Sequence, residues 1–465
     1  MTDLRACLAA QGDLLLVPGQ LYADGTCQSG KAVLIRKGKY HEIDDAAALV
    51  ARHPDLSPVD LPDHLLMPGF IDTHTHLTQS LGKSLVFGEP SEIFRRIWVP
   101  LESSLSERMV YLSTKLSALE CLRGGFTTAV DAGTRSEGCI DALAQAARET
   151  GLRSVIGLIC NDLGGAAHIP DRADILKRAQ RHLDGWQDDP LIHPSLAISI
   201  PEVGTDEMLR EVSQMAGQAG AVFQTHVNEH LVAVERSLVD RGMRPLEHLA
   251  HIDALGPHVL IAHSTLITPT ELNLLRDSGT AVAYNPVASV WKGNAIAPAL
   301  QMEALGIRFG LGTDGTRADG FRLMDAAESL QRAGFGLASG DSSCGGGWLW
   351  LEAATSRAAN SAGLSKITGA VEVGLEADFL LVNLDRPEFT PSYDLIWELV
   401  RYGNRDQIDA VFTQGRLRLW QGWPVDWDAR ALLSEIRAHA GKAIEGSGIQ
   451  RIHPVAAEHK KARRS

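Results

Sequence analysis

Positions 65–76 read Leu-Leu-Met-Pro-Gly-Phe-Ile-Asp-Thr-His-Thr-His, a mostly apolar run that ends in two histidines. The run predicts a strand over Leu65–Asp72 that is buried on both faces, as the strands of a parallel sheet are. Residues i and i+2 of an extended chain point to the same side, so His74 and His76 would lie about 7 Å apart. Their imidazoles can therefore converge on one ion, although a His-x-His pair alone is a weak signal.

Seven further apolar runs follow at spacings that suit successive strand–helix units. They are Phe126–Asp131, Arg153–Cys160, Ser195–Ile200, Ala221–His226, His258–His263, Thr280–Asn285 and Ile307–Asp314. Amphipathic stretches between them, such as Glu107–Leu122, predict helices. Eight parallel strands with crossover helices predict a (β/α)8 TIM-like barrel. The alternative, an open doubly wound α/β sheet, would leave an unpaired edge at each end.

The two ends of the chain have a different pattern. Short strand-like runs broken by Gly and Asp occur at 13–17, 32–36 and 40–43, and again at 378–383 and 410–413. Neither set is large enough for a core of its own, so together they predict one small β-sandwich domain beside the barrel. The expected organisation is a composite β domain (1–66 and 371–425), a catalytic barrel (67–370), and a C-terminal helix with a polar tail (426–465).

Composition excludes several classes of protein. The 465 residues carry 44 Lys+Arg against 57 Asp+Glu, a net charge of −13 that argues against a nucleic-acid partner. Six cysteines without a Cys-x-x-Cys motif fit neither a disulfide framework nor a thiolate zinc site. No run of about 18 uncharged apolar residues predicts a membrane span. The N-terminal residues lack the apolar stretch of a signal peptide, so a cytoplasmic location is expected.

Four histidines and one aspartate fall at the ends of four predicted strands. His226, His263 and Asp314 join His74 and His76 at the carboxyl ends, the face on which barrels build active sites. His74, His76, His226 and Asp314 form an N/O donor set that suits zinc or ferrous iron and leaves a position for water. Such an ion lowers the pKa of bound water from ~15.7 to about 7. The set therefore predicts metal-assisted hydrolysis.

Glu229 lies three residues after His226. In a loop after the strand, its carboxylate can reach the same pocket and carry protons, whereas the neighbouring His230 is expected to be exposed. The Pro-Cys-x-x-Cys signature of the cytidine-deaminase fold is missing, and so are the Gly-rich motifs that cradle nucleotide phosphates.

At these residues the chain resembles the amidohydrolase superfamily. It is most similar to the branch of aminohydrolases and chlorohydrolases that includes guanine, S-adenosylhomocysteine and pterin deaminases and the triazine hydrolases. The resemblance extends from the lead-in Met67–Asp72 to Gly374-Leu375-Glu376-Ala377-Asp378, which matches the return into the β domain. It implies one divalent ion, zinc before iron, because no Lys lies on the third or fourth predicted strand, where binuclear relatives carry a carboxylated Lys. It also implies a homodimer.

The resemblance further implies a role for each site residue. The metal ligands would be His74, His76, His226 and Asp314. Asp314 would take a proton from water, His263 would polarise the reacting centre, and Glu229 would protonate a ring nitrogen and help ammonia leave. Gln79 matches the position whose amide contacts a ring carbonyl in oxopurine and pterin deaminases, and Trp98 is expected to line the entrance.

One segment departs from the superfamily pattern. Many relatives have Asn-Pro-x-Ser-Asn after strand seven, but this chain has Asn285-Pro286-Val287-Ala288-Ser289. The substrate contacts made by this loop are therefore expected to differ.

The expected function is a metal-dependent aminohydrolase that removes an exocyclic amino group from a small N-heterocycle of the purine, pterin, pyrimidine or triazine type. A departing amino group needs a proton and a departing chloride does not, so Glu229 favours deamination. Hydrolysis of a cyclic amide or a carbon–halogen bond on the same scaffold is the enzymatic alternative. The non-enzymatic alternative is a barrel that binds a heterocycle without turning it over.

Overall fold

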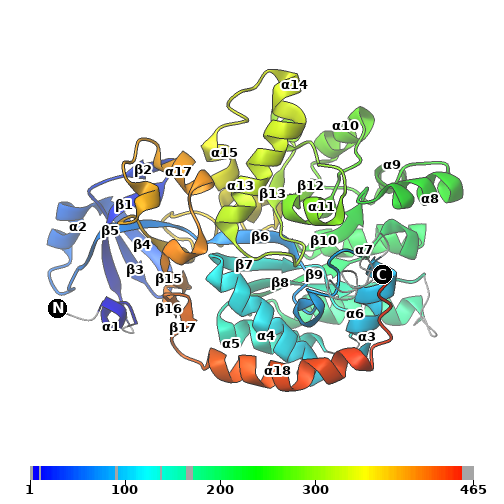
Figure 1. The fold of residues 1–465 in the computed structure, drawn as a ribbon, viewed down its shortest axis with the longest axis horizontal. Coiled ribbons are helices and arrows are strands. Elements are labelled where there is room, and N and C mark those ends of the chain that lie inside the picture. Colours follow the sequence, from blue (N-terminus) through cyan, green and yellow to red (C-terminus); the bar gives the residue numbers. More distant parts are fainter. Residues whose placement is uncertain (1–3, 10–11, 90–92, 137–138, 164–170, 453–465) are drawn as a thin grey trace, which may run out of the picture.

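The computed structural model describes residues 4–9, 12–89, 93–136, 139–163 and 171–452. Its centre is a barrel of eight parallel strands, in which each strand pairs with its neighbours in sequence order (Figure 1). These strands are β6 (Phe70–Thr75), β7 (Phe126–Asp131), β8 (Arg153–Ile159), β9 (Ile192–Ala197), β10 (Val222–Val227), β11 (Val259–His263), β12 (Ala281–Tyr284) and β13 (Phe309–Leu311). The predicted TIM-like barrel is confirmed.

Helices surround the barrel and cover its strands with their apolar faces. The longer ones are α4 (Glu107–Arg123), α5 (Ile140–Thr150), α6 (Arg172–Gly185), α7 (Asp206–Gln218), α8 (Leu231–Arg241), α10 (Pro269–Ser278) and α13 (Gly320–Gln331). Shorter helices on the loops include α3 (Val99–Ser104), α9 (Pro245–His251) and α11 (Pro286–Lys292), with a π-helical turn η2 at Phe94–Trp98. Within the described residues, no helix has the length and apolar character needed to cross a bilayer.

The barrel closes where β13 meets β6. The Asp314 N–H donates to the carbonyl of His74 at 2.8 Å. The buried Asp72 carboxylate accepts from the Thr313 N–H at 2.9 Å and from its hydroxyl at 2.5 Å. A Cβ on Gly312 would lie 2.2 Å from Asn285 Oδ1, so the seam requires glycine at this position. Closure brings the first and last strands together and so places Asp314 beside His74.

The first predicted strand is in fact two strands that belong to different sheets. Leu65–Asp72 was expected to form one strand, but β5 (Val59–Pro68) lies in the second sheet and the barrel begins with β6. Gly69 separates them, and its N–H donates to the carbonyl of Asp378 at 3.0 Å. A Cβ on Gly69 would lie 2.2 Å from Thr127 Oγ1, so only glycine lets the chain cross β7 this closely.

Strands from both chain ends form the second sheet, on the left in Figure 1. It contains nine strands in the order β17-β16-β15-β14-β5-β1-β3-β4, with β2 paired to β1. Their bounds are β1 (Leu14–Ala23), β2 (Thr26–Gln28), β3 (Lys31–Arg36), β4 (Lys39–Asp45), β14 (Phe379–Asn383), β15 (Ile408–Thr413), β16 (Arg416–Trp420) and β17 (Trp423–Pro424). The two ends of the chain meet in the antiparallel pair β5–β14, and Phe379 stacks on Phe412 at 4.3 Å in the core beneath.

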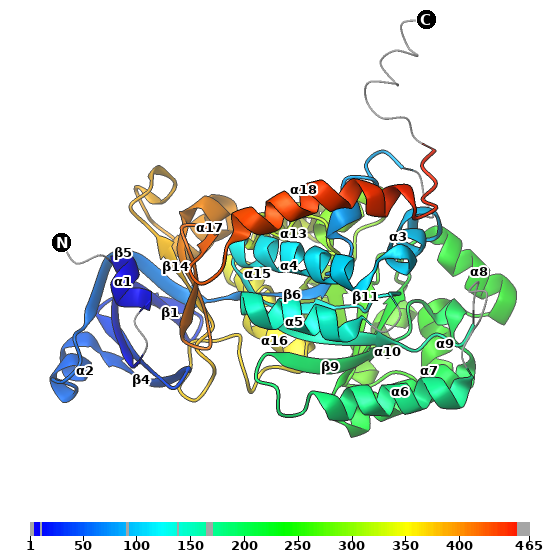
Figure 2. The same ribbon diagram turned by 90° about the horizontal axis from the view of Figure 1, so that it is seen from below.

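The C-terminal helix α18 (Ala429–Glu445) returns along the barrel and packs on α4 (Figure 2). Its N-cap is Asp428, whose carboxylate accepts from the N–H groups of Arg430 and Ala431. A carboxylate at a helix N-terminus satisfies free N–H groups and favours the helix dipole.

Candidate metal centre and active site

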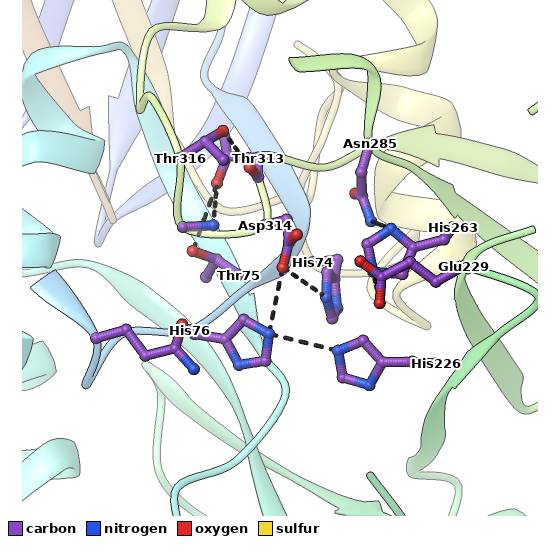
Figure 3. Close-up of polar contacts among 12 residues, drawn as sticks. His74, Thr75, His76, His226, Glu229, His263, Asn285, Thr313, Asp314 and Thr316 are labelled. Atoms are coloured by element: carbon purple, nitrogen blue, oxygen red, sulfur yellow. Dashed lines mark hydrogen bonds and ion pairs between the residues drawn. The ribbon is translucent and has the colours of Figure 1, made fainter. Parts of the chain in front are cut away.

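The predicted site residues gather at the carboxyl ends of the barrel strands (Figure 3). His74 lies on β6 and His76 directly after it, while His226 lies on β10. His263 is the last residue of β11, and Asp314 follows β13 by three positions. Residues up to 240 positions apart in the sequence therefore surround one point, because the barrel places the ends of all its strands on one face.

The donor atoms of His74, His76, His226 and Asp314 lie at metal-ligand spacing. All four lie within 4.8 Å of one another. Asp314 Oδ1 is 3.4 Å from His74 Nε2 and 3.3 Å from His76 Nε2, and His76 Nε2 is 3.4 Å from His226 Nε2. A tetrahedral site with bonds of ~2.0–2.1 Å has donor–donor separations of about 3.3–3.4 Å. The donor set therefore fits a divalent cation of zinc size.

The imidazoles are held in the form that binds a metal. His226 Nδ1 lies 2.6 Å from the Ser199 carbonyl, to which it donates its proton, so Nε2 keeps its lone pair toward the centre. His74 Nε2 is buried and makes no hydrogen bond within the described part of the chain. Burial lowers the pKa of His74, and burial with the neighbouring histidines lowers the pKa of His226 well below its usual value. A lowered pKa favours the neutral ring, which is the form that binds a metal.

Glu229 and His263 form a second group that shares Asp314. Their donor atoms and those of Asp314 lie within 4.8 Å of one another. The Asn285 amide donates to His263 Nδ1 at 3.2 Å, which leaves the ring proton on Nε2, 3.6 Å from Glu229 Oε2. Burial lowers the pKa of His263 to about 3, so its ring stays neutral and can donate one hydrogen bond into the pocket.

Left-handed backbone aims three of these segments inward. Asn228 has φ 54°, His263 has φ 77° and Asp314 has φ 53°. A residue other than glycine in this region costs about 1–3 kcal/mol, and such residues cluster at functional sites. The strained residues lie at the strand ends, where the chain turns sharply while the side chain stays at the centre.

Lys292 belongs to the site and was missed by the sequence analysis. It ends α11, and its Nζ donates to Glu229 Oε1 at 2.8 Å and to Asp314 Oδ2. Burial raises the pKa of Asp314, but the Lys292 charge and the neighbouring His74 and His76 outweigh it and hold the pKa well below its usual range. The only sequence signal was the altered pattern after Asn285, in the segment that ends at Lys292.

The pKa of Glu229 is held low in the same way as that of Asp314. Burial raises the pKa of this carboxyl, but the neighbouring His263, the Lys292 charge and a bond from His230 hold it well below its usual range. His230 was expected to be exposed, and this prediction was wrong. Its side chain is 30% exposed, its Nε2 is 3.2 Å from Glu229 Oε1, and its Nδ1 is 3.0 Å from Asn294 Oδ1.

A cavity of about 1000 Å³, including its open mouth, leads to the centre. It is lined by His76, His226, Glu229 and Asp314 and also by Gln79, Trp98 and Arg95. Gln79 is fixed by a buried carboxylate, since its amide donates to Glu102 Oε1 at 3.0 Å. The two predicted substrate contacts, Gln79 and Trp98, thus line the same cavity as the metal-ligand set.

Three comparisons agree with this architecture. A sequence profile described as the amidohydrolase family matches residues 65–418. The chain is 28% identical over 417 residues to 5-methylthioadenosine/S-adenosylhomocysteine deaminase of Syntrophobacter fumaroxidans, which covers 88% of this chain and 93% of the relative. It is 29% identical to 5'-deoxyadenosine deaminase of Methanopyrus kandleri, with 84% of this chain and 93% of the relative covered.

Among solved structures, the fold matches an adenosine deaminase from Xanthomonas campestris with bound zinc. The TM-score is 0.85 at 25% identity, and the match covers 93% of this chain and 99% of the other.

Proposed function

The chain belongs to the amidohydrolase family and is a hydrolase of carbon–nitrogen bonds, and from this premise we propose that it deaminates a purine-type N-heterocycle. Water replaces an exocyclic amino group on a ring carbon, and the products are the oxo ring and ammonia. The observation that carries the proposal is the position of the Glu229 carboxylate, whose oxygen lies within 4.8 Å of the donor atoms of Asp314 and His263.

Zinc is the proposed metal. His74, His76, His226 and Asp314 would hold it, since their donor spacing and neutral imidazoles suit a tetrahedral N/O site. A bound divalent cation supplies Lewis acidity, which makes a water molecule acidic enough to ionise near neutral pH.

The protein's own residues then manage the protons. Asp314 is ionised and can accept a proton from the attacking water. Glu229 is ionised as well, so each proton that it delivers would first reach it from the water through Asp314. The first would go to the ring nitrogen beside the reacting carbon, and the second to the departing amino group. His263 Nε2–H would donate a hydrogen bond to the oxygen that develops charge on that carbon. Water thus gives its oxygen to the ring and its two protons to the ring nitrogen and ammonia.

The purine-type ring is proposed from the named relatives and from the cavity. Two curated relatives are deaminases of adenosine derivatives, and the zinc-bound structure is described as an adenosine deaminase. The cavity wall combines apolar side chains, including Ile93, Phe94 and Trp98, with polar groups of the metal-ligand set and its neighbours. This combination suits a flat heterocycle held by stacking and a few hydrogen bonds. The homodimer is kept as a prediction.

The test measures ammonia from a panel of aminated heterocycles. Glu229→Gln should lower kcat by about 10²–10⁴-fold, because it removes a proton carrier while keeping the side-chain size. Zinc content should stay at the wild-type level. Glu235→Gln makes the same chemical change at an exposed position of α8 and should leave kcat unchanged.

Each alternative predicts a different product. A cyclic-amide hydrolase would open the ring and release no ammonia, and a dehalogenase would release halide. A binding protein would release nothing. Full activity of Glu229→Gln would remove the proton-carrier role of Glu229.

A further inference from the structure

The Lys292 ammonium lies between the carboxylates of Glu229 and Asp314. The side chain is 19% exposed. It lines the main cavity and also a neighbouring cavity of about 650 Å³ whose wall includes Phe87, Trp291 and Asp314. The ammonium is therefore part of the wall that a molecule in either cavity would touch.

Lys292 and a metal ion would use different oxygens of Asp314. Oδ2 accepts from Lys292, whereas Oδ1 faces His74 Nε2 and His76 Nε2. The two carboxylate oxygens of Glu229 also have different partners, since Oε1 accepts from Lys292 and Oε2 faces His263. The contacts of Lys292 therefore leave the oxygens that face the histidines free for their own roles.

The ammonium has one hydrogen-bond donor to spare. A lysine carries three N–H donors and no acceptor. Within the described residues, two of them are taken, one by Glu229 and one by Asp314. A charged donor that is largely removed from water gains most from an acceptor that carries negative charge. The spare N–H is thus suited to an oxygen of the bound substrate.

The positions of the two carboxylates decide where that oxygen would be. In the proposed deamination, the amino-bearing carbon faces Asp314 and the adjacent ring nitrogen faces Glu229. Lys292 is bonded to both carboxylates and so lies along the ring edge that these two atoms define. Two ring atoms flank this edge. In a purine base the atom beyond the amino-bearing carbon is a ring-fusion carbon or a ring nitrogen, whereas the carbon beyond the nitrogen can carry an oxygen. An oxygen that faces the ammonium would therefore be a substituent of the atom beyond the nitrogen.

This inference depends on the deaminase proposal. We propose that Lys292 binds an oxo or enolate oxygen on the ring atom next to the nitrogen that Glu229 serves, so that the preferred substrates are amino-oxo heterocycles. An oxygen at this position withdraws ring electrons and can carry negative charge, which an ammonium stabilises. A ring with a hydrogen at the same position leaves the spare donor unpaired.

A purely structural role makes a different prediction. The donor atoms of Glu229 and Asp314 lie within 4.8 Å of each other, and Lys292 also compensates that repulsion. If this were its whole role, replacing Lys292 would reduce turnover of every substrate by the same factor.

The kinetic test uses zinc-loaded enzyme and two pairs of bases that differ only in one oxo group: guanine against 2-aminopurine, and isoguanine against adenine. The wild type should favour the oxo member by at least ~10-fold in kcat/KM, the value of one charge-assisted hydrogen bond. In Lys292→Met this preference should be lost, mainly through KM. Lys292→Arg should retain most of it, because it keeps a cationic donor. Equal losses on both members of a pair would overturn the proposal.

A binding measurement separates this proposal from the deaminase proposal. Xanthine, an oxo ring without an amino group, should bind wild-type enzyme at least ~10-fold more tightly than Lys292→Met by calorimetry, at equal zinc content. If none of the four bases releases ammonia, deamination of these rings fails, and the xanthine affinities still decide the role of Lys292. Equal xanthine affinity of the two proteins, or no binding by the wild type, would refute it.

Discussion

Removing the charge of Asp378 should destabilise the junction between the two sheets. Asp378 closes the Gly-x-x-Ala-Asp return directly before β14, and its side chain is 0% exposed. Oδ2 accepts from Arg153 Nε at 3.0 Å, and Oδ1 accepts from the Gln414 N–H at 2.7 Å. Arg153 begins β8 and is 1% exposed. Asp378→Asn keeps the shape of the side chain but leaves the guanidinium buried without its counter-charge.

Breaking a buried ion pair on one side costs about 3–5 kcal/mol. A chain of 465 residues unfolds with an entropy of about 1 kcal/mol per kelvin at ~2.1 cal/mol/K per residue, so the melting temperature should fall by about 3–5 °C. Urea unfolding and calorimetry measure both quantities. Activity at low temperature should be unchanged, because Arg153 is at the opposite end of the barrel strands from the metal-ligand set.

Two further variants make the assay decisive. Arg153→Met combined with Asp378→Asn removes the stranded charge and should recover about half of the loss or more. Glu435→Gln breaks an ion pair with Arg108 at the surface, where the Glu435 side chain is 33% exposed and the Arg108 side chain 56% exposed. This variant should lower the free energy of unfolding by no more than ~1 kcal/mol. If Asp378→Asn is no less stable than Glu435→Gln, or the double variant recovers nothing, the ion-pair argument is wrong.

Three other predictions concern the seam, the effect of pH and the metal. Thr313→Val removes the hydroxyl that donates to the buried Asp72 carboxylate. The free energy of unfolding in urea should fall by about 1.5–3 kcal/mol, and zinc binding should weaken in a chelator competition. If both quantities stay at the wild-type value, this prediction is wrong. Burial and the nearby Arg153 lower the pKa of His193 to about 4. Between pH 6.5 and 4 the unfolded chain therefore binds more protons than the folded one, and the free energy of unfolding falls as the pH falls. His193→Gln should make this decline shallower, and identical slopes for the variant and the wild type would contradict the prediction. Chelation should abolish turnover and lower the melting temperature. Zinc added back at ~1,000 times its Kd should raise the free energy of unfolding by about 4 kcal/mol. A chelated enzyme that still turned over substrate would rule out a catalytic role for the metal.

The barrel was predictable because its signals are local. Each parallel strand is an uninterrupted apolar run, and the His-x-His spacing places two side chains on one face wherever the strand lies. Parallel strands in a closed barrel all end on one side, so a histidine or aspartate at a strand end could be assigned to the active face before any distance was known.

The division at Gly69 was not predictable in the same way. The apolar pattern runs through Leu65–Asp72 without a break, since both strands are buried. Only the packing against Thr127 and the bond to the Asp378 carbonyl show that the chain passes there from one sheet to the other. Periodicity reports burial, and burial is the same in either sheet.

The sequence by itself determined which residue types lie at the strand ends, and therefore the class of chemistry. The tertiary structure alone decided which groups hold them in position: the Ser199 carbonyl on His226, the Asn285 amide on His263, and the Lys292 ammonium between Glu229 and Asp314. These contacts join residues 22 to 63 positions apart in the sequence. Their distances are set by how the barrel closes and how each loop turns at its strand end, and no local periodicity of the chain encodes either.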